Sequence, residues 1–178
     1  MFMAARDHSH QALAAHDAFL RGDLDALQSL LGAPPEFPNS PMPADWGLGE
    51  TCLGYAIGQS PLSCIQALLH AGADPNYEAS DGFPSLIAAL SSDRDDIEAI
   101  LELLLKHGAD VQQRGINDWT PLHWAVSQHD ASLVRRLLAH GADPLAHTRV
   151  DDCTSPLEDA EARGYDDLVE LLRAQPPR

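Results

Sequence analysis

The hydrophobic residues of this chain recur at helical spacing in several short segments. In the segment 132–138, the apolar residues fall at positions i, i+1, i+4 and i+5, which places them on one face of a helix. These residues are Leu133, Val134, Leu137 and Leu138. The segments 65–69 and 97–104 follow the same pattern. Because two short helices cannot bury such faces alone, the pattern predicts units that stack on one another.

Two short phrases repeat in phase along the chain. The phrases "LLHAGAD", "LLKHGAD" and "LLAHGAD" end at residues 74, 110 and 143, which are 36 and 33 residues apart. The phrases "TCLGYA", "PSLIAA", "TPLHWA" and "SPLEDA" begin at residues 51, 84, 120 and 155. A repeat period near 33 residues indicates a solenoid of stacked units.

The phrase "TPLHWA", followed by "GAD" at the expected offset, resembles the ankyrin-repeat family over nearly the whole chain. The resemblance implies one all-α domain, 1–178, built as a solenoid of about five helix-turn-helix units with finger loops. We number these expected units 1 to 5. They cover about 8–45, an N-terminal cap with a proline-rich loop, then 46–78, 79–114, 115–147 and 148–178, the C-terminal cap.

Three segments depart from the repeat. The segment 32–45, "GAPPEFPNSPMPAD", has five prolines and no helical pattern, so we expect an extended, exposed loop. Extra residues near "SSDRDD" (91–96) predict a longer turn between the helices of unit 3. The second helix of unit 5 is more polar than its counterparts, as a terminal cap requires.

Composition and charge restrict the choice of partner. The 178 residues include 27 acids and 11 bases, a net charge of -16, which disfavours nucleic acid and anionic membranes as partners. The imbalance is concentrated in residues 1–105, with 15 acids and 3 bases. We expect a protein partner with a basic or neutral binding face, although solubility alone also accounts for the charge. We expect the chain itself to be a monomer.

The sequence also bears on location. It has no apolar run of the roughly 20 residues that a membrane span needs. The N-terminus lacks the basic and then apolar segments of a signal peptide, so we expect a cytoplasmic protein. Ten of the 11 bases are Arg and alanine is abundant, which suggests a GC-rich, bacterial genome.

Candidate chemistry is sparse. His123 stands at the H of T-P-L-H, where the resemblance implies a structural hydrogen-bonding role, and His107 and His140 precede the glycines that end helices. The sequence has no CxxC, G-x-S-x-G, HExxH or glycine-rich phosphate loop. Cys52 and Cys64 fall at helix positions expected to be buried, and Cys153 falls in a loop. We therefore expect no catalytic site, metal or cofactor.

Function should therefore depend on the concave surface that, by the resemblance, the finger tips and first helices form. Apolar residues there, rimmed by acids, would form a partner-binding stripe; alternatively, finger aromatics pack on the next finger. The candidate partner-binding residues are Leu48, Phe83, Ile116, Asn117, Trp119, Trp124, Ser127, Gln128, His129 and Arg149.

The sequence thus predicts a non-enzymatic protein–protein interaction module. Its role would be that of a dedicated inhibitor, for instance an immunity protein that blocks a toxin, or of a regulatory adaptor. Three alternatives stay open. They are an acidic stabiliser or chaperone of a basic protein, a host-directed bacterial effector, and an enzyme that uses an unrecognised thiol.

Overall fold

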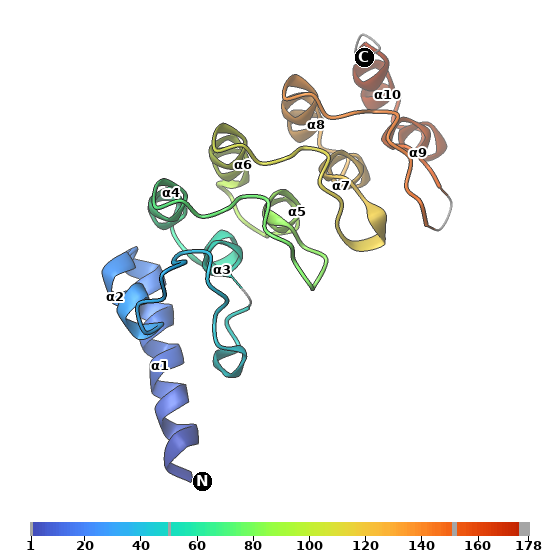
Figure 1. The fold of residues 1–178 in the computed structure, drawn as a ribbon. Coiled ribbons are helices and arrows are strands. Elements are labelled where there is room, and N and C mark those ends of the chain that lie inside the picture. Colours follow the sequence, from blue (N-terminus) through green and yellow to red (C-terminus); the bar gives the residue numbers. More distant parts are fainter. Residues whose placement is uncertain (1, 50, 151–152, 175–178) are drawn as a thin grey trace.

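Five pairs of helices stacked in one row make up the computed structural model, which describes residues 2–49, 51–150 and 153–174 (Figure 1). The pairs are α1 (Phe2–Arg21) with α2 (Leu24–Leu30), α3 (Cys52–Gln59) with α4 (Leu62–His70), α5 (Ser85–Leu90) with α6 (Ile97–Lys106), α7 (Pro121–Ser127) with α8 (Ala131–Ala139), and α9 (Pro156–Arg163) with α10 (Asp166–Arg173). Two 3-10 turns, η1 (Ala44–Trp46) and η2 (Ile116–Asp118), lie in the loops. The described residues contain no strand, and the predicted all-α solenoid of helix-turn-helix units is confirmed.

The helices form two layers. The first helices of units 2 to 5 pack in sequence, α3 on α5, α5 on α7 and α7 on α9, while α6 packs on α4 and α10 on α8. The connecting fingers project from the side of the first helices (Figure 1). We call the surface made by α3, α5, α7, α9 and the fingers 46–49, 79–83, 115–119 and 147–150 the finger face.

Local sequence sets where the helices begin. The Thr51 hydroxyl accepts a hydrogen bond from a backbone N–H of the first turn of α3, and the Asp130 carboxylate accepts two from the first turn of α8. At α9, Ser155 and Glu158 form a reciprocal capping box, and Pro156 fills the first helical position, where no donor is needed. Caps of this kind stabilise a helix by about 1 kcal/mol each.

The helix faces predicted from the sequence are buried between the units. Burial of one Leu or Ile side chain contributes about 1.5–3 kcal/mol, so this core supplies most of the favourable free energy. The fully buried residues of these faces are Ile65, Leu68, Ile100, Leu101, Leu104, Val134 and Leu137.

A ladder of side-chain amides connects the loops that follow the second helices. The Asn76 amide donates to the Gly108 carbonyl (2.9 Å) and accepts from the Asp110 N–H (2.7 Å), so it bridges unit 2 to unit 3. Asn39 makes the same pair of bonds from unit 1 to unit 2, at 2.9 and 2.8 Å. Gln112 makes the donor bond from unit 3 to unit 4, at 3.3 Å. Gly72, Asp74, Gly108 and Asp110 are exposed, so these bonds replace hydrogen bonds to water with specific bonds between neighbouring units.

The ladder ends at Leu145, which occupies the equivalent position in unit 4. Its side chain carries no polar atom and is 57% exposed. Unit 5 is therefore joined to unit 4 without this bond.

The prediction of an exposed proline-rich loop is wrong for part of the segment 32–45. The side chains of Pro38, Ser40 and Met42 are buried, and the segment 35–38 forms turns. The physical reason is the amide ladder, because Asn39 fastens the middle of the loop to the neighbouring loop of unit 2.

The predicted longer turn in unit 3 is confirmed. Six residues, 91–96, separate α5 from α6, whereas three, 128–130, separate α7 from α8. The Arg94 guanidinium holds this turn, since it donates to the Asp96 carboxylate (2.7 Å) and to the Ser60 carbonyl of unit 2 (2.7 Å).

Adjacent fingers approach each other at their backbones. The Ile116 N–H donates to the Gly82 carbonyl at 2.8 Å. A Cβ on Gly115 would lie 2.4 Å from that carbonyl oxygen, so only glycine fits there. Asn117 and Asp118 both have positive φ, at 58° and 60°, as in a two-residue type I′ hairpin turn.

None of the described helices is both long and apolar enough to cross a membrane.

Replacement of Asn76 by alanine should destabilise the chain by about 1–3 kcal/mol, because the variant loses two hydrogen bonds between units 2 and 3, each worth about 0.5–1.5 kcal/mol. Urea unfolding followed by circular dichroism measures this change. Leu145→Ala is the matched control at the equivalent position, and it should leave stability nearly unchanged. Equal stability of Asn76→Ala and the wild type would contradict the role of the ladder.

Candidate functional site

The structure places the predicted partner-binding residues on the finger face or at its rim. The fingers carry Leu48, Phe83, Ile116, Asn117, Trp119 and Arg149, α7 carries Trp124 and Ser127, and the turn after α7 carries Gln128 and His129. Five of these ten side chains are exposed: Ile116, Asn117, Gln128, His129 and Arg149. The other five are half-buried. That these residues bind a partner stays a prediction.

Phe83, Trp119 and Trp124, which we call the aromatic cluster, lie together across units 3 and 4. The Trp124 ring meets Trp119 edge to face at a centroid distance of 5.8 Å, and it meets Phe83 in the same way at 6.2 Å. The Trp124 indole N–H donates to the Leu90 carbonyl of α5 at 3.2 Å. Edge-to-face pairs of this kind contribute about 0.5–1.5 kcal/mol each.

The sequence leaves open whether the finger aromatics face a partner or pack on the next finger, and the aromatic cluster has features of both. Its rings pack across the boundary between units, yet all three side chains stay half-buried and keep part of their surface on the finger face. The internal contacts also hold the rings in fixed positions. A fixed, partly exposed aromatic surface loses little conformational entropy when it meets another protein.

His129 and Ser127 make internal contacts that the sequence did not predict. The His129 ring stacks on Tyr165 at a centroid distance of 3.9 Å, and its Nε2 lies 2.9 Å from the Asp167 carboxylate. The Ser127 hydroxyl donates to the Trp124 carbonyl at 2.8 Å. His129 thus fastens unit 5 to unit 4, and only the remainder of its surface faces outward.

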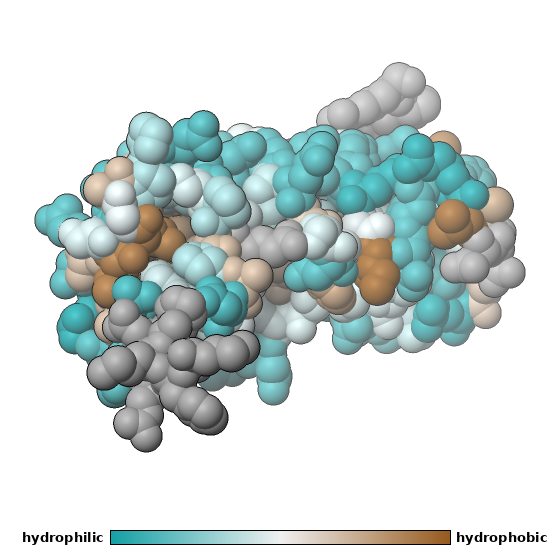
Figure 2. All heavy atoms as spheres, turned by 60° about the horizontal axis from the view of Figure 1, so that its bottom comes forward, coloured by the Kyte–Doolittle hydropathy of each residue, from teal (hydrophilic) through white to brown (hydrophobic). Residues whose placement is uncertain are grey.

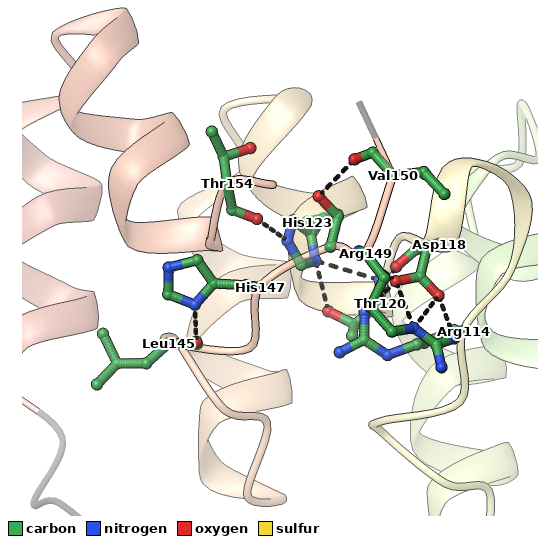
Figure 3. A network of polar contacts seen from close by, with 10 residues as sticks. Arg114, Asp118, Thr120, His123, Leu145, His147, Arg149, Val150 and Thr154 are labelled. Atoms are coloured by element: carbon green, nitrogen blue, oxygen red, sulfur yellow. Dashed lines mark hydrogen bonds and ion pairs between the residues drawn. The ribbon is translucent and has the colours of Figure 1, made fainter. Parts of the chain in front are cut away.

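An ion network holds the fingers of units 4 and 5 together (Figure 3). The Asp118 carboxylate accepts hydrogen bonds from the Arg149 N–H (2.7 Å) and Nε (3.0 Å) and from Arg114 Nη1 (2.8 Å). These bonds, those from Arg149 first, lower the pKa of Asp118 to about 2. Arg149 therefore forms an ion pair with Asp118, although its side chain stays largely exposed.

His123 has the structural role that the resemblance implies (Figure 3). Its Nδ1 accepts from the Thr120 N–H (3.1 Å) and hydroxyl (2.9 Å), so Nε2 carries the proton and donates to the Thr154 carbonyl (3.1 Å). Burial lowers the pKa of His123, and the bond to the Thr154 carbonyl only partly offsets this effect. The imidazole is a neutral connector between units 4 and 5.

Other candidate chemical groups also have structural roles. His107 Nδ1 donates to the Leu103 carbonyl at 2.9 Å and so gives this carbonyl of the last turn of α6 a hydrogen-bond partner. Cys52 and Cys64 are buried as predicted, and burial raises the pKa of Cys52 to about 12, which disfavours the reactive thiolate. Cys153 is exposed, as its loop position suggested. Among the described residues, no group of three or more His, Cys, Asp or Glu side chains could hold a metal ion.

A groove on the finger face was not predicted. It lies between α3 and α5 and contains two adjoining hollows of about 470 Å³ each. Its lining includes Leu48 and Phe83, which are candidate partner-binding residues from the sequence, and Tyr55 and Ala88, which are not. A sequence signal for it exists, because Tyr55, Ala88 and Trp124 occupy the same repeat position and alternate large, small and large.

The surface around these features is mainly polar. Figure 2, in which the lower side of Figure 1 comes forward, shows a largely hydrophilic surface on which hydrophobic residues form separate patches. Contacts to a partner would therefore combine a few apolar anchors with a polar surround.

Comparison with known proteins gives one family match. A family model described as ankyrin repeats in three copies matches residues 13–115 and 97–176. Protein phosphatase 1 regulatory subunit 27 of Mus musculus is 39% identical, over 51% of this chain and 57% of its own length. "Putative ankyrin repeat protein YahD" of Escherichia coli (strain K12) is 29% identical, over 71% of this chain and 80% of its own length. "Putative E3 ubiquitin-protein ligase XBAT35" of Arabidopsis thaliana is 32% identical over 61% of this chain, but the match spans only 23% of that protein.

Lowering the pH should destabilise the chain through His123. The folded-state pKa of His123 lies below its ordinary value of 6.5, so the unfolded chain takes up a proton that the folded chain excludes. The stability contributed by the neutral imidazole is complete above pH 6.5 and is lost as the pH falls below it. Urea unfolding between about pH 7 and pH 5 should show a steeper loss for the wild type than for His123→Gln, whose amide does not titrate there. Parallel pH profiles for the two proteins would contradict this role.

Proposed function

Because the chain belongs to the ankyrin-repeat family, we propose that it is a non-enzymatic binding protein that holds one partner protein on its finger face. The aromatic cluster is the centre of the contact, and the biological role is that of a regulatory adaptor or dedicated inhibitor. Family membership carries protein–protein interaction as its coarse function. The partner, the surface and the regulatory role are parts of the proposal.

The observation that carries this proposal is the aromatic cluster. Binding energy in protein interfaces concentrates on a few residues, and Trp is among the most enriched of them. Trp119 and Trp124 are half-buried, rigidly packed and surrounded by polar surface on the finger face. Ile116, which is 40% exposed, extends the apolar surface to the tip of the same finger.

The regulatory role has support from one relative. Protein phosphatase 1 regulatory subunit 27 is named as a regulatory subunit, and it shares 39% identity with 51% of this chain. The net charge of -16 favours a partner whose binding face is basic or neutral. Monomeric state and cytoplasmic location stay predictions.

The second candidate is an acidic stabiliser of a basic protein. In that case, carboxylates spread over the surface would carry the affinity, and the aromatic cluster would serve only to join units 3 and 4. The net charge of -16 is the observation that favours this candidate. Salt dependence separates the two candidates, because screening weakens contacts between exposed charges far more than apolar contacts.

Trp119→Ala should weaken the binding of a natural partner by about 2 kcal/mol or more. The partner would be captured on the immobilised chain from its native cells and identified by mass spectrometry, and the purified pair would then be measured by isothermal titration calorimetry. The affinity of the wild type should fall only moderately with salt, and far less than that of an interface held by exposed charges alone.

Leu13→Ala is the matched control, since Leu13 is an exposed apolar residue, 64% accessible, on α1 outside the finger face. Circular dichroism verifies that Trp119→Ala keeps the helical fold. Unchanged binding by a folded Trp119→Ala, together with collapse of the affinity at high salt, would favour the acidic stabiliser and exclude the aromatic contact.

A further inference from the structure

The lining of the groove between α3 and α5 includes one small residue at a repeat position that is large in the neighbouring units. Ala88 of unit 3 stands at the repeat position that Tyr55 fills in unit 2 and Trp124 fills in unit 4. Both hollows are lined by Ala88, and Phe83, which also lines both, is fixed against the Trp124 ring. The lining of both hollows thus has a methyl group where the neighbouring units carry an aromatic ring. We call this feature the Ala88 groove.

The two glycines of α3 differ in whether packing within the chain requires them. A Cβ on Gly54 would lie 2.9 Å from the Thr51 hydroxyl and 3.0 Å from the Tyr77 hydroxyl, so packing within the chain explains this glycine. A Cβ on Gly58 would meet no atom of the described residues within 4 Å, although Gly58 also lies in the helix and lines both hollows. Glycine destabilises a helix interior by up to about 1 kcal/mol relative to alanine. At Gly58 no internal contact offsets this cost, and the open surface admits close approach from outside.

The charge of the Ala88 groove is negative and uncompensated. Asp81 lines one hollow and Asp93 the other, and both side chains are exposed. Among the described residues, neither carboxylate takes part in an ion pair. Arg94, the one cation among the described lining residues, is already bound to Asp96 and to the Ser60 carbonyl, each at 2.7 Å.

We propose that the Ala88 groove binds a basic segment of the partner protein. One bulky apolar side chain of the segment lies over Ala88, and its flanking Lys or Arg side chains face Asp81 and Asp93. The open surface at Gly58 lets the backbone of the segment approach α3. This assignment rests on the proposed function, since it supplies the chemistry and the position of a contact on the same finger face.

The test uses random linear peptides displayed on phage and selected on the full-length chain. The selected peptides should carry Lys or Arg around a Leu, Phe or Trp. In fluorescence anisotropy with the synthetic peptides, Ala88→Trp should raise Kd about tenfold or more, equal to about 1.4 kcal/mol. The double change Asp81→Asn and Asp93→Asn should weaken binding and reduce its salt dependence.

Two further variants separate binding from folding. Gly58→Ala should bind the peptides several-fold more weakly while its urea unfolding shows stability equal to or above that of the wild type, because alanine favours the helix. Ala162→Trp is the control for Ala88→Trp, because it introduces the same side chain on the finger face outside the groove. Ala162 is an exposed residue of α9 at the repeat position of Gly58, and its replacement should leave Kd unchanged.

Several outcomes would overturn the assignment. These are a failure to enrich any peptide, enrichment of peptides without basic residues, and equal binding by Ala88→Trp and the wild type. A dimer seen by sedimentation and abolished by Ala88→Trp would identify a second copy of this chain as the occupant. If the natural partner binds Ala88→Trp normally but not Trp119→Ala, the groove assignment fails and the proposed function stands. If the partner binds both variants as it binds the wild type, both proposals fail.

Discussion

The structure depends on one constraint: no unit can bury its own apolar faces. Each pair of helices has a strip of Leu and Ile that only a neighbouring unit covers. The amide ladder through Asn39, Asn76 and Gln112 adds hydrogen bonds between the loops of adjacent units. Stability is therefore a property of the interfaces between units.

At the first helices, other side chains make the hydrogen bonds between adjacent units. In unit 4, the His123 imidazole donates to the carbonyl of Thr154, just before α9. Unit 2 has Gly54 at that repeat position, and the Tyr77 hydroxyl occupies the freed space and donates to the carbonyl of Phe83, just before α5 (3.2 Å). A tyrosine from the loop thus replaces the histidine of the helix. Gly54 has no side chain and lines both hollows, so its presence on α3 also contributes to the Ala88 groove.

The proposed binding surface follows from this internal order. Rings of the aromatic cluster join units 3 and 4, and the Asp118 network joins the fingers of units 4 and 5, so contacts that stabilise the stack also fix the outward surface. A partner would meet a preorganised surface and would not need to order it. The cost is that substitutions there affect stability as well as binding, which is why each binding test above includes a fold or stability measurement or a matched control.

The sequence by itself determined the solenoid, because the 33-residue period and the helical spacing of Leu and Ile leave no other way to bury those faces. The helical pattern also predicted the burial of Cys52 and Cys64, and the family resemblance implied the role of His123. Only the tertiary structure decided which side chains meet between units. The docked position of Asn39, the stacking of His129 on Tyr165 and the hollow over Ala88 each join residues of different units. Such contacts depend on how closely neighbouring units approach each other. A repeat pattern determines the order of the units along the stack but not the distance between them.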